Sequence, residues 1–189
     1  MLKRAVITGM GVVSPNGIGK AAFCRAILDG KSGVKLITRF DTSDLPVKIA
    51  GEIQDFNELD WIEARERKHV SRSVPLAVAA STEALKDSGL DPASMSLEQK
   101  REIGVVLGTG GGAHDFSDAQ YHMYYAGKVK QISIFSIPSG TMGTMSSEVS
   151  MRFGFRGLSH VVTSGCTSST DAIAYATRQL QLGALPMML

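Results

Sequence analysis

The sequence has few cysteines, no long apolar run and no excess of one charge. The two cysteines, Cys24 and Cys166, are far apart and form neither a C-x-x-C pair nor a metal-ligand spacing, which indicates free thiols in the reducing cytoplasm. No segment approaches the roughly 20 apolar residues that cross a membrane. With 20 Lys and Arg against 18 Asp and Glu, the charge is nearly balanced, which argues against a general nucleic-acid binder.

Internal repeats, low-complexity tracts and obvious linkers are also missing, so 189 residues suit one domain or part of a larger one. Predicted strands alternate with predicted helices, which indicates the α/β class. The strands are expected at 4–8, 47–53, 103–107, 161–163 and from Pro186 onward. The helices are expected at 18–29, 61–70, 74–88, 116–125, 139–153 and 172–182. The helix at 74–88 should bury an apolar side: Leu76, Ala77, Ala80, Ala84 and Leu85.

The stretch most suggestive of chemistry is residues 161–172, VVTSGCTSSTDA. A β-branched run ends in Ser164 and Gly165, Cys166 follows, and hydroxyl residues lead into an Ala-rich segment that stops at Gly183. This order predicts a strand, a tight turn, the cysteine and a helix. Side-chain oxygens suited to the first turn of that helix come from Thr167, Ser168 and Asp171. We expect the helix to be largely buried, because little of it is polar: Ala172, Ile173, Ala174, Ala176 and Leu180.

A cysteine at the start of a helix has a chemical consequence. The free N–H groups and partial positive charge of a helix N-terminus favour a thiolate over a thiol. The backbone N–H of Cys166 also points to where an oxyanion would sit. The alternative is a small buried hydrophobic residue, which is what most free cysteines are. Cys24 has no such setting, since it falls in the apolar neighbourhood of the helix at 18–29.

Four stretches together resemble the β-ketoacyl-acyl-carrier-protein synthases, condensing enzymes of the thiolase superfamily. They are residues 6–17 (VITGMGVVSPNG), 108–112 (GTGGG), Pro138-Ser139 and residues 156–169 (RGLSHVVTSGCTSS). They occur in the family's order, and residues 165–171 are closest to the ketosynthase-α subunits of type II polyketide systems. The resemblance implies a thiolase-like layered α/β fold. Residues 1–189 would be the N-terminal half of a ketosynthase domain, with its C-terminal half absent from this chain.

The resemblance also implies a mechanism. Cys166 accepts an acyl group as a thioester from a carrier protein or coenzyme A, and a malonyl-carrier-protein then loses carbon dioxide. The resulting carbanion attacks the thioester and gives a β-ketoacyl product, in fatty-acid or polyketide biosynthesis. No metal or redox cofactor is implied. Two histidines and a lysine that complete the family's site belong to its second half, and their positions are not occupied by any histidine of this sequence: His69, His114, His122 and His160.

The same resemblance implies partners and binding positions. The expected partners are acyl carrier protein, acyl and malonyl thioesters, and a second subunit that forms a homodimer or a heterodimer with a ketosynthase-like chain. Two acyl-pocket positions that are commonly bulky hold Gly111 and Ser136, which predicts room for a long or rigid chain unless Phe135 and Met142 fill it. The basic segment 63–72 is either a solvated helix face or a docking site for the acidic carrier protein, through Arg65, Lys68 and Arg72.

Three other interpretations stay open. Residues 108–113 match the G-x-G-x-x-G/A pattern of dinucleotide binding after a strand, although no acidic residue follows about 20 residues later to hold a ribose. A cysteine-dependent acyl hydrolase would need a histidine within hydrogen-bond reach of Cys166. A non-catalytic partner of a ketosynthase, similar to a chain-length factor, or an inert fragment would share the fold. Partners of that kind usually lack the cysteine, so Cys166 favours the catalytic type.

Overall fold

The computed structural model describes residues 3–189, which divide into two compact units. The first unit holds residues 3–7, 58–78 and 91–189. The second holds residues 8–57 and 79–90. Helix α2 (Ser73–Asp87) contributes its first part to one unit and its second part to the other.

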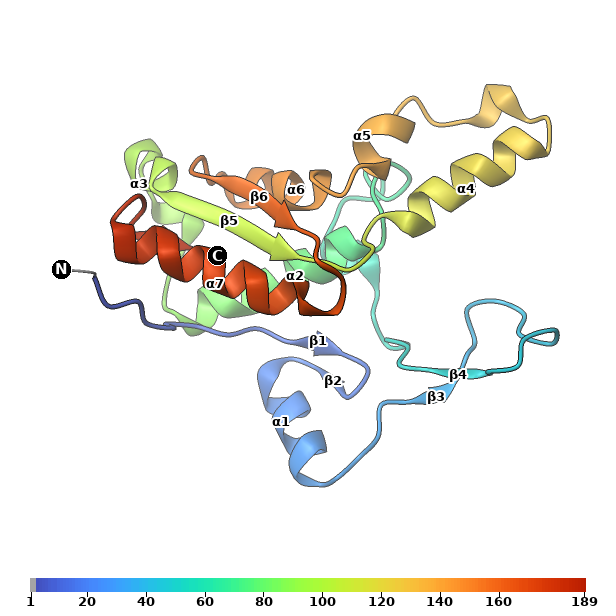
Figure 1. Ribbon diagram of the computed structural model, residues 1–189, viewed down its shortest axis with the longest axis horizontal. Coiled ribbons are helices and arrows are strands. Elements are labelled where there is room, and N and C mark those ends of the chain that lie inside the picture. The colour runs from blue at the N-terminus through green and yellow to red at the C-terminus, as the bar shows by residue number, and fades with distance from the viewer. Residues whose placement is uncertain (1–2) are drawn as a thin grey trace. The chain divides into compact units, whose positions relative to one another are not determined.

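Three parallel strands form the centre of the first unit (Figure 1). Strand β5 (Ile103–Gly108) lies between β6 (Ser159–Val162) and β7 (Met187–Met188). Val105 is opposite Ser159 on one side, and Ile103 is opposite Met187 on the other. The strands predicted at 103–107, at 161–163 and after Pro186 are thereby confirmed, with β6 ending one residue earlier than expected.

Helices α6 (Thr144–Phe153) and α7 (Ser168–Leu182) pack on opposite faces of this sheet (Figure 1). The connection from β5 to β6 and the connection from β6 to β7 step across the sheet in opposite directions. Because parallel crossovers are right-handed, their helices fall on opposite sides. Val105 on β5 and Val149 on α6 have no exposed surface. The run Ile103–Val106 is buried throughout, as expected for a strand covered on both faces.

The expected burial of the helix after Cys166 is wrong for this chain. Within α7 only Ser168 and Ala172 are buried, whereas Ile173 is 63% and Leu182 72% exposed. The expectation counted the apolar residues between Ala172 and Leu180 and not the polar residues of the same helix, such as Arg178 and Gln179. The sheet covers one side of α7, and among residues 3–189 nothing buries the other side.

The remaining helices of the first unit differ in part from those predicted. The helix expected at 139–153 is interrupted at residues 141–143, so that α5 is a separate short helix before α6. The helix predicted at 116–125 is confirmed and begins at His114. A capping box joins Ser96 and Gln99 at the start of α3, in a stretch without a predicted helix. The bounds are α3 (Leu97–Arg101), α4 (His114–Tyr125), α5 (Ser136–Gly140), and the 3₁₀ turns η1 (Glu58–Asp60), η2 (Pro92–Ser94), η3 (Val129–Gln131) and η4 (Gly165–Thr167).

The helix expected at 61–70 is also wrong, because this segment is a series of turns. The buried carboxylate of Glu58 explains the difference. It forms ion pairs with Arg67 and with Arg72, the latter at 2.6 Å between Oε1 and Nη1. A turning backbone brings both guanidinium groups back to one carboxylate, and a charged sequence pattern does not reveal that requirement.

The second unit is built from short elements. A hairpin of β1 (Val13–Ser14) and β2 (Gly17–Ile18) precedes α1 (Lys20–Leu28), and β3 (Lys35–Leu36) pairs with β4 (Ile49–Ala50). The helix at 18–29 and the strand within 47–53 are confirmed in shorter form. The strand predicted at 4–8 is wrong, since those residues join no ladder and Ile7 is 79% exposed. An apolar segment forms a strand only where another strand pairs with it, and the apolar composition of residues 4–8 does not show whether one does.

The helix predicted at 74–88 is confirmed as α2, and its predicted apolar side is confirmed in part. Leu85 is buried and the other four predicted residues are half-buried, whereas Val74, Val78 and Ala79, which were not predicted, are buried as well. Two of the predicted positions, Ala80 and Ala84, instead present the helix backbone to glycines at the start of the second unit. A Cβ at Gly11 would lie 2.8 Å from the Ala84 nitrogen, so the chain approaches the helix more closely than any side chain allows.

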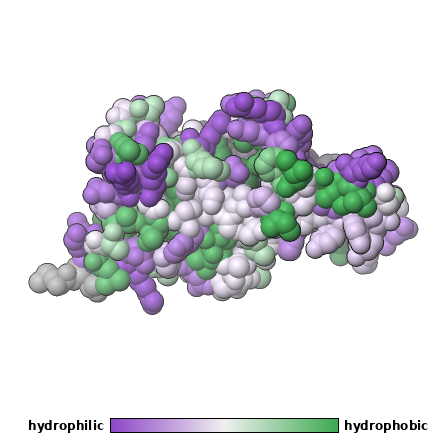
Figure 2. Space-filling model, turned by 90° about the horizontal axis from the view of Figure 1, so that it is seen from above, coloured by the Kyte–Doolittle hydropathy of each residue, from purple (hydrophilic) through white to green (hydrophobic). Residues whose placement is uncertain are grey.

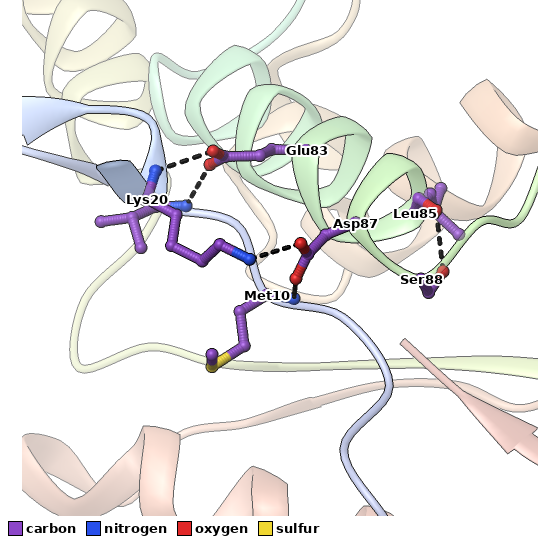
Figure 3. A network of polar contacts seen from close by, with 7 residues as sticks. Met10, Lys20, Glu83, Leu85, Asp87 and Ser88 are labelled. Atoms are coloured by element: carbon purple, nitrogen blue, oxygen red, sulfur yellow. Dashed lines mark hydrogen bonds and ion pairs between the residues drawn. The ribbon is translucent and has the colours of Figure 1, made fainter. Parts of the chain in front are cut away.

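Two carboxylates near the end of α2 accept hydrogen bonds from backbone N–H groups elsewhere in the second unit (Figure 3). Glu83 accepts hydrogen bonds from the backbone N–H of Lys20 at 2.7 Å and of Val12 at 2.8 Å. Asp87 accepts from the Met10 N–H at 3.0 Å and from the Lys20 ammonium. The Lys20 hydrogen bond, with help from the Met10 N–H, holds the pKa of Asp87 below its ordinary value.

Replacing Glu83 by Ala should destabilise the protein by about 2 kcal/mol, because two part-buried N–H donors lose a charged acceptor. Glu83→Gln keeps one acceptor oxygen and should cost about half as much. Urea unfolding measures both values. Glu98→Ala, at a surface carboxylate, is the matched control. If Glu83→Ala changed the free energy of unfolding by less than ~0.5 kcal/mol, the two hydrogen bonds to Glu83 would not stabilise the second unit.

Apolar side chains also reach the surface. Apolar residues (green) lie between polar ones on the face shown in Figure 2. The most exposed large ones include Ile134 at 90% and Leu28 at 87%. None of the helices within residues 3–189 combines the length and the hydropathy needed to span a membrane.

Candidate active site

The candidate nucleophile lies where strand β6 ends. Cys166 is exposed on η4, between β6 and α7. The neighbouring strand β5 ends beside it in the glycine-rich turn 108–112. In open parallel sheets, ligands bind outside the carboxyl ends of the strands. Cys166 therefore occupies the part of the first unit in which chemistry is expected.

Hydrogen bonds join the two turns. The Thr109 N–H donates to the Val162 carbonyl at 3.0 Å, and Ser168 Oγ lies 3.0 Å from the Thr109 carbonyl. Gly108 sits directly on the backbone of α7, where a Cβ would come within 2.5 Å of the Ser168 carbonyl carbon. The glycine turn thus acts as a support for the segment that carries the cysteine.

The turn around Cys166 combines a left-handed residue with an uncapped helix. Gly165 has φ of +74°, a conformation that favours glycine. Thr167, the residue before α7, makes no side-chain cap, contrary to the expectation that hydroxyls would cap this helix. The N–H of Ser168, the first residue of α7, donates to the Gly165 carbonyl within the preceding 3₁₀ turn. The partial positive charge at the start of α7 can still stabilise negative charge that develops next to Cys166.

A polar network that the sequence did not predict surrounds the same turn. Asp171 Oδ2 accepts hydrogen bonds from Ser164 Oγ and, at 3.1 Å, from Thr167 Oγ1. On the buried side, Ser168 Oγ accepts from the Ser164 N–H at 2.9 Å and lies 2.6 Å from the Gly165 carbonyl. The hydroxyl-rich run around Cys166 was the only sequence signal for it.

The structure changes the expected setting of Cys24. Its thiol is exposed instead of lying in an apolar neighbourhood. Helix α1 buries only Ala26, so most of its apolar residues have nothing to pack against within residues 3–189. Both thiols are consequently open to solvent, and only Cys166 has a helix N-terminus beside it.

Two cavities lie along α4, in the region of the expected acyl-pocket positions. Ser136 lines one of about 290 Å³, together with Tyr121, Tyr124 and Ile137. His114 lines the other, of about 490 Å³, and a Cβ at Gly111 would lie 2.9 Å from the His114 ring. The two cavities share Ser117 and Tyr121. Ser136 therefore lines the smaller cavity, whereas Gly111 lines neither and reaches the larger one only through its contact with the His114 ring.

The side chains expected to fill this space do not line either cavity. Phe135 instead contacts His69, with ring centroids 4.3 Å apart and the rings tilted by 44°. Met142 lies in the break between α5 and α6. The cavity beside Ser136 is bounded mainly by tyrosine and isoleucine.

The three basic residues expected to dock a carrier protein have different surroundings. Arg65 and Lys68 are exposed on the turns of 61–70, and Arg65 pairs with Glu63 at 2.7 Å. The side chain of Arg72 is only 18% exposed because Glu58 holds it, and its N–H donates to Asp115 at 2.8 Å. Arg65 and Lys68 are exposed to solvent, whereas Arg72 is engaged within the fold.

Two of the alternative interpretations lack structural support. Thr109 Oγ1 accepts a hydrogen bond from the Gly112 N–H at 2.8 Å, so this N–H turns inward and not toward a phosphate. No hydrogen bond joins Cys166 to a histidine in the described part of the chain, residues 3–189, as a hydrolase would need. No group of three His, Cys, Asp or Glu side chains in these residues is arranged to hold a metal ion.

Comparison with known proteins gives one consistent result. A family model described as the beta-ketoacyl synthase, N-terminal domain, matches residues 3–189. The chain is 35% identical over 195 residues to 3-oxoacyl-(acyl-carrier-protein) synthase 2 of Rhizobium meliloti, covering 99% of this chain and 46% of that protein. It is 36% identical over 192 residues to the tetracenomycin polyketide synthase ketoacyl synthase alpha subunit of Streptomyces glaucescens, covering 96% and 43%.

A solved structure agrees. The ishigamide ketosynthase/chain length factor superposes with a TM-score of 0.84 at 25% identity, over 98% of this chain and 46% of that one. The chain therefore belongs to the beta-ketoacyl synthase family and has its thiolase-like α/β fold. It spans about half the length of the relatives it matches.

Proposed function

We propose that this chain supplies the acyl-accepting cysteine of a β-ketoacyl-acyl-carrier-protein synthase. Cys166 takes an acyl group from a thioester, with release of the thiol that carried it, and holds the group as a new thioester. A malonyl thioester then loses carbon dioxide, and its α-carbon attacks the acyl carbon to give a β-ketoacyl product and the free Cys166. The observation that carries the proposal is an exposed thiol at an uncapped helix N-terminus, beside a glycine turn that holds it.

Residues 1–189 form the N-terminal half of the ketosynthase domain in this proposal. The decarboxylation histidines come from sequence outside residues 1–189, in the same protein or in another subunit. A solved relative described as the ishigamide ketosynthase/chain length factor supports a dimer with a second ketosynthase-like chain. A non-catalytic role is less well supported, because Cys166 is present and exposed.

Acyl carrier protein is the proposed donor of both substrates, and Arg65 and Lys68 are its proposed contacts. Both side chains are exposed cations on one segment of turns, which suits an acidic partner that approaches by electrostatic attraction. Arg72 would act indirectly, since its ion pair with Glu58 shapes the segment that presents the other two.

Acyl transfer to Cys166 tests the proposal. The protein is incubated with an acyl-coenzyme A or acyl-carrier-protein, and its intact mass is measured. We expect one acyl adduct, which persists in Cys24→Ser and is lost in Cys166→Ala. An adduct on Cys24, or no adduct with any thioester, would refute the proposed function.

Ser136 and Gly111 should control which chains are accepted. Ser136→Phe places a ring in the cavity of about 290 Å³, and Gly111→Ile pushes against the His114 ring. We expect each variant to slow acylation of Cys166 by long donors about 10-fold relative to short ones, a typical effect of pocket size. Competition between short and long acyl-coenzyme A, read by intact mass, measures the ratio.

The control is Ile134→Phe, at a position that is 90% exposed and lines neither cavity. It should leave the ratio unchanged. An unchanged ratio in both Ser136→Phe and Gly111→Ile would mean that these positions do not line the acyl pocket.

A further inference from the structure

The polar network around Cys166 is centred on one carboxylate oxygen of Asp171. Ser164 precedes the cysteine by two residues and Thr167 follows it directly, and the hydroxyl of each lies against the same oxygen of Asp171. Only Gly165, with its left-handed backbone, separates Ser164 from Cys166. One carboxylate oxygen therefore holds both ends of the short segment that carries the thiol.

The hydrogen-bond geometry favours the carboxylate over the other acceptors. Thr167 Oγ1 is 3.1 Å from Asp171 Oδ2, but 3.3 Å from both Ser164 Oγ and the Ser164 carbonyl. Hydrogen bonds to an ionised acceptor are roughly twice as strong as neutral ones. The single hydroxyl proton of Thr167 is thus directed to Asp171, as is that of Ser164.

Exposure separates this network from the core. Ser164, Thr167 and Asp171 are all exposed, whereas Ser168, on the other side of the turn, is only 2% exposed and is tied to Thr109. Ser168 is positioned to support the fold. The exposed network holds the turn on its open side, where an acyl donor would approach.

We propose that Asp171 is a positioning residue for Cys166: by accepting hydrogen bonds from the hydroxyls of Ser164 and Thr167, it fixes the turn and hence the direction of the thiol. The proposal rests on the proposed function of Cys166 and adds a residue to it. Asp171 does not contact the substrate in this scheme. Its effect reaches the reaction through the orientation of the nucleophile, to which reaction rates are sensitive.

Acylation kinetics with four variants test the proposal. Asp171→Ala should lower the maximal rate constant for acylation of Cys166 by ~10-fold or more and leave the half-saturating donor concentration unchanged. Asp171→Asn, which keeps an acceptor oxygen, should recover most of the rate. The double variant Ser164→Ala/Thr167→Val removes both donors and should match Asp171→Ala. Combining all three changes should cause no further loss, because contacting residues are not additive.

Hydrogen exchange separates this proposal from the proposed function. In Asp171→Ala, amides of residues 164–167 should exchange at least ~10-fold faster than in the unmodified chain or in Asp171→Asn, since local opening becomes easier. This readout needs no acyl donor, so it still decides the role of Asp171 if the unmodified protein takes no acyl group.

Three results would overturn the positioning role. The first is equal acylation and equal exchange in Asp171→Ala and the unmodified protein. The second is a loss in Asp171→Ala that Asp171→Asn does not recover. The third is a fall in Tm of more than ~5 °C that accompanies the loss of rate, because it would assign Asp171 to folding.

Discussion

The chain of residues 1–189 alone is expected to form no β-ketoacyl product from acyl and malonyl thioesters. The resemblance to condensing enzymes implies that decarboxylation uses histidines outside residues 1–189, and no histidine within the described residues 3–189 is hydrogen-bonded to Cys166. General acid and base groups contribute ~10²- to 10⁴-fold to such steps. We therefore expect the rate to be at least ~10³-fold below that of a complete relative, with product measured by mass spectrometry of the carrier protein.

Acylation of Cys166 in the same sample is the internal control. An acylated but non-condensing chain would show that the nucleophile is competent and that the missing step is decarboxylation. Condensation by the chain alone at the rate of a complete enzyme such as the Rhizobium meliloti relative would contradict this division of roles. It would also mean that a residue within residues 1–189 performs the decarboxylation.

Gly108→Ala is expected to have the largest effect on the fold. The new Cβ would come within 2.5 Å of the Ser168 carbonyl carbon and 2.6 Å of the Ser169 Cα. These are backbone atoms of α7, which cannot move aside as the end of a side chain can. Inserting atoms into a packed region costs 1–3 kcal/mol and occasionally more, and we expect about 3 kcal/mol. Acylation of Cys166 should also fall, since α7 has to shift at the end that carries the cysteine.

Gly143→Ala is the matched control for this experiment. A Cβ there meets nothing within 4 Å, and the backbone is right-handed with φ of −56°. Its free energy of unfolding in urea should change by less than ~0.5 kcal/mol. If Gly108→Ala behaved like Gly143→Ala in both stability and acylation, the glycine turn would not be the support for the Cys166 segment.

The sequence predicted the strand–turn–helix unit around Cys166 because its signals are local. A β-branched run, a glycine and a strong helix former specify their own conformation within a few residues. The parallel strand at 103–107 was predictable for the same reason. The unit around Cys166 and the strand at 103–107, with the glycine-rich turn 108–112 that follows this strand, contain most of the candidate site.

The errors occur where contacts distant in sequence decide the structure. The backbone of residues 61–70 forms turns because the Glu58 carboxylate forms ion pairs with both Arg67 and Arg72. Hydrophobic periodicity in the sequence does not reveal such a pairing. Residues 4–8 have the composition of a strand but no neighbour to pair with. The network on Asp171 was missed for a different reason. Serine, threonine and aspartate at the start of a helix usually indicate a cap, and here they bind one another.

Selective labelling of the two cysteines tests the central claim most directly. Cys24 and Cys166 are both exposed, so accessibility alone predicts equal reaction with a cerulenin-like electrophile. Only Cys166 lies beside a helix N-terminus, whose partial positive charge can stabilise negative charge that develops on the reacting sulfur. We therefore predict, by peptide mapping after brief treatment near neutral pH, at least ~10-fold more label on Cys166 than on Cys24. Equal labelling of the two residues would contradict the assignment of Cys166 as an activated nucleophile.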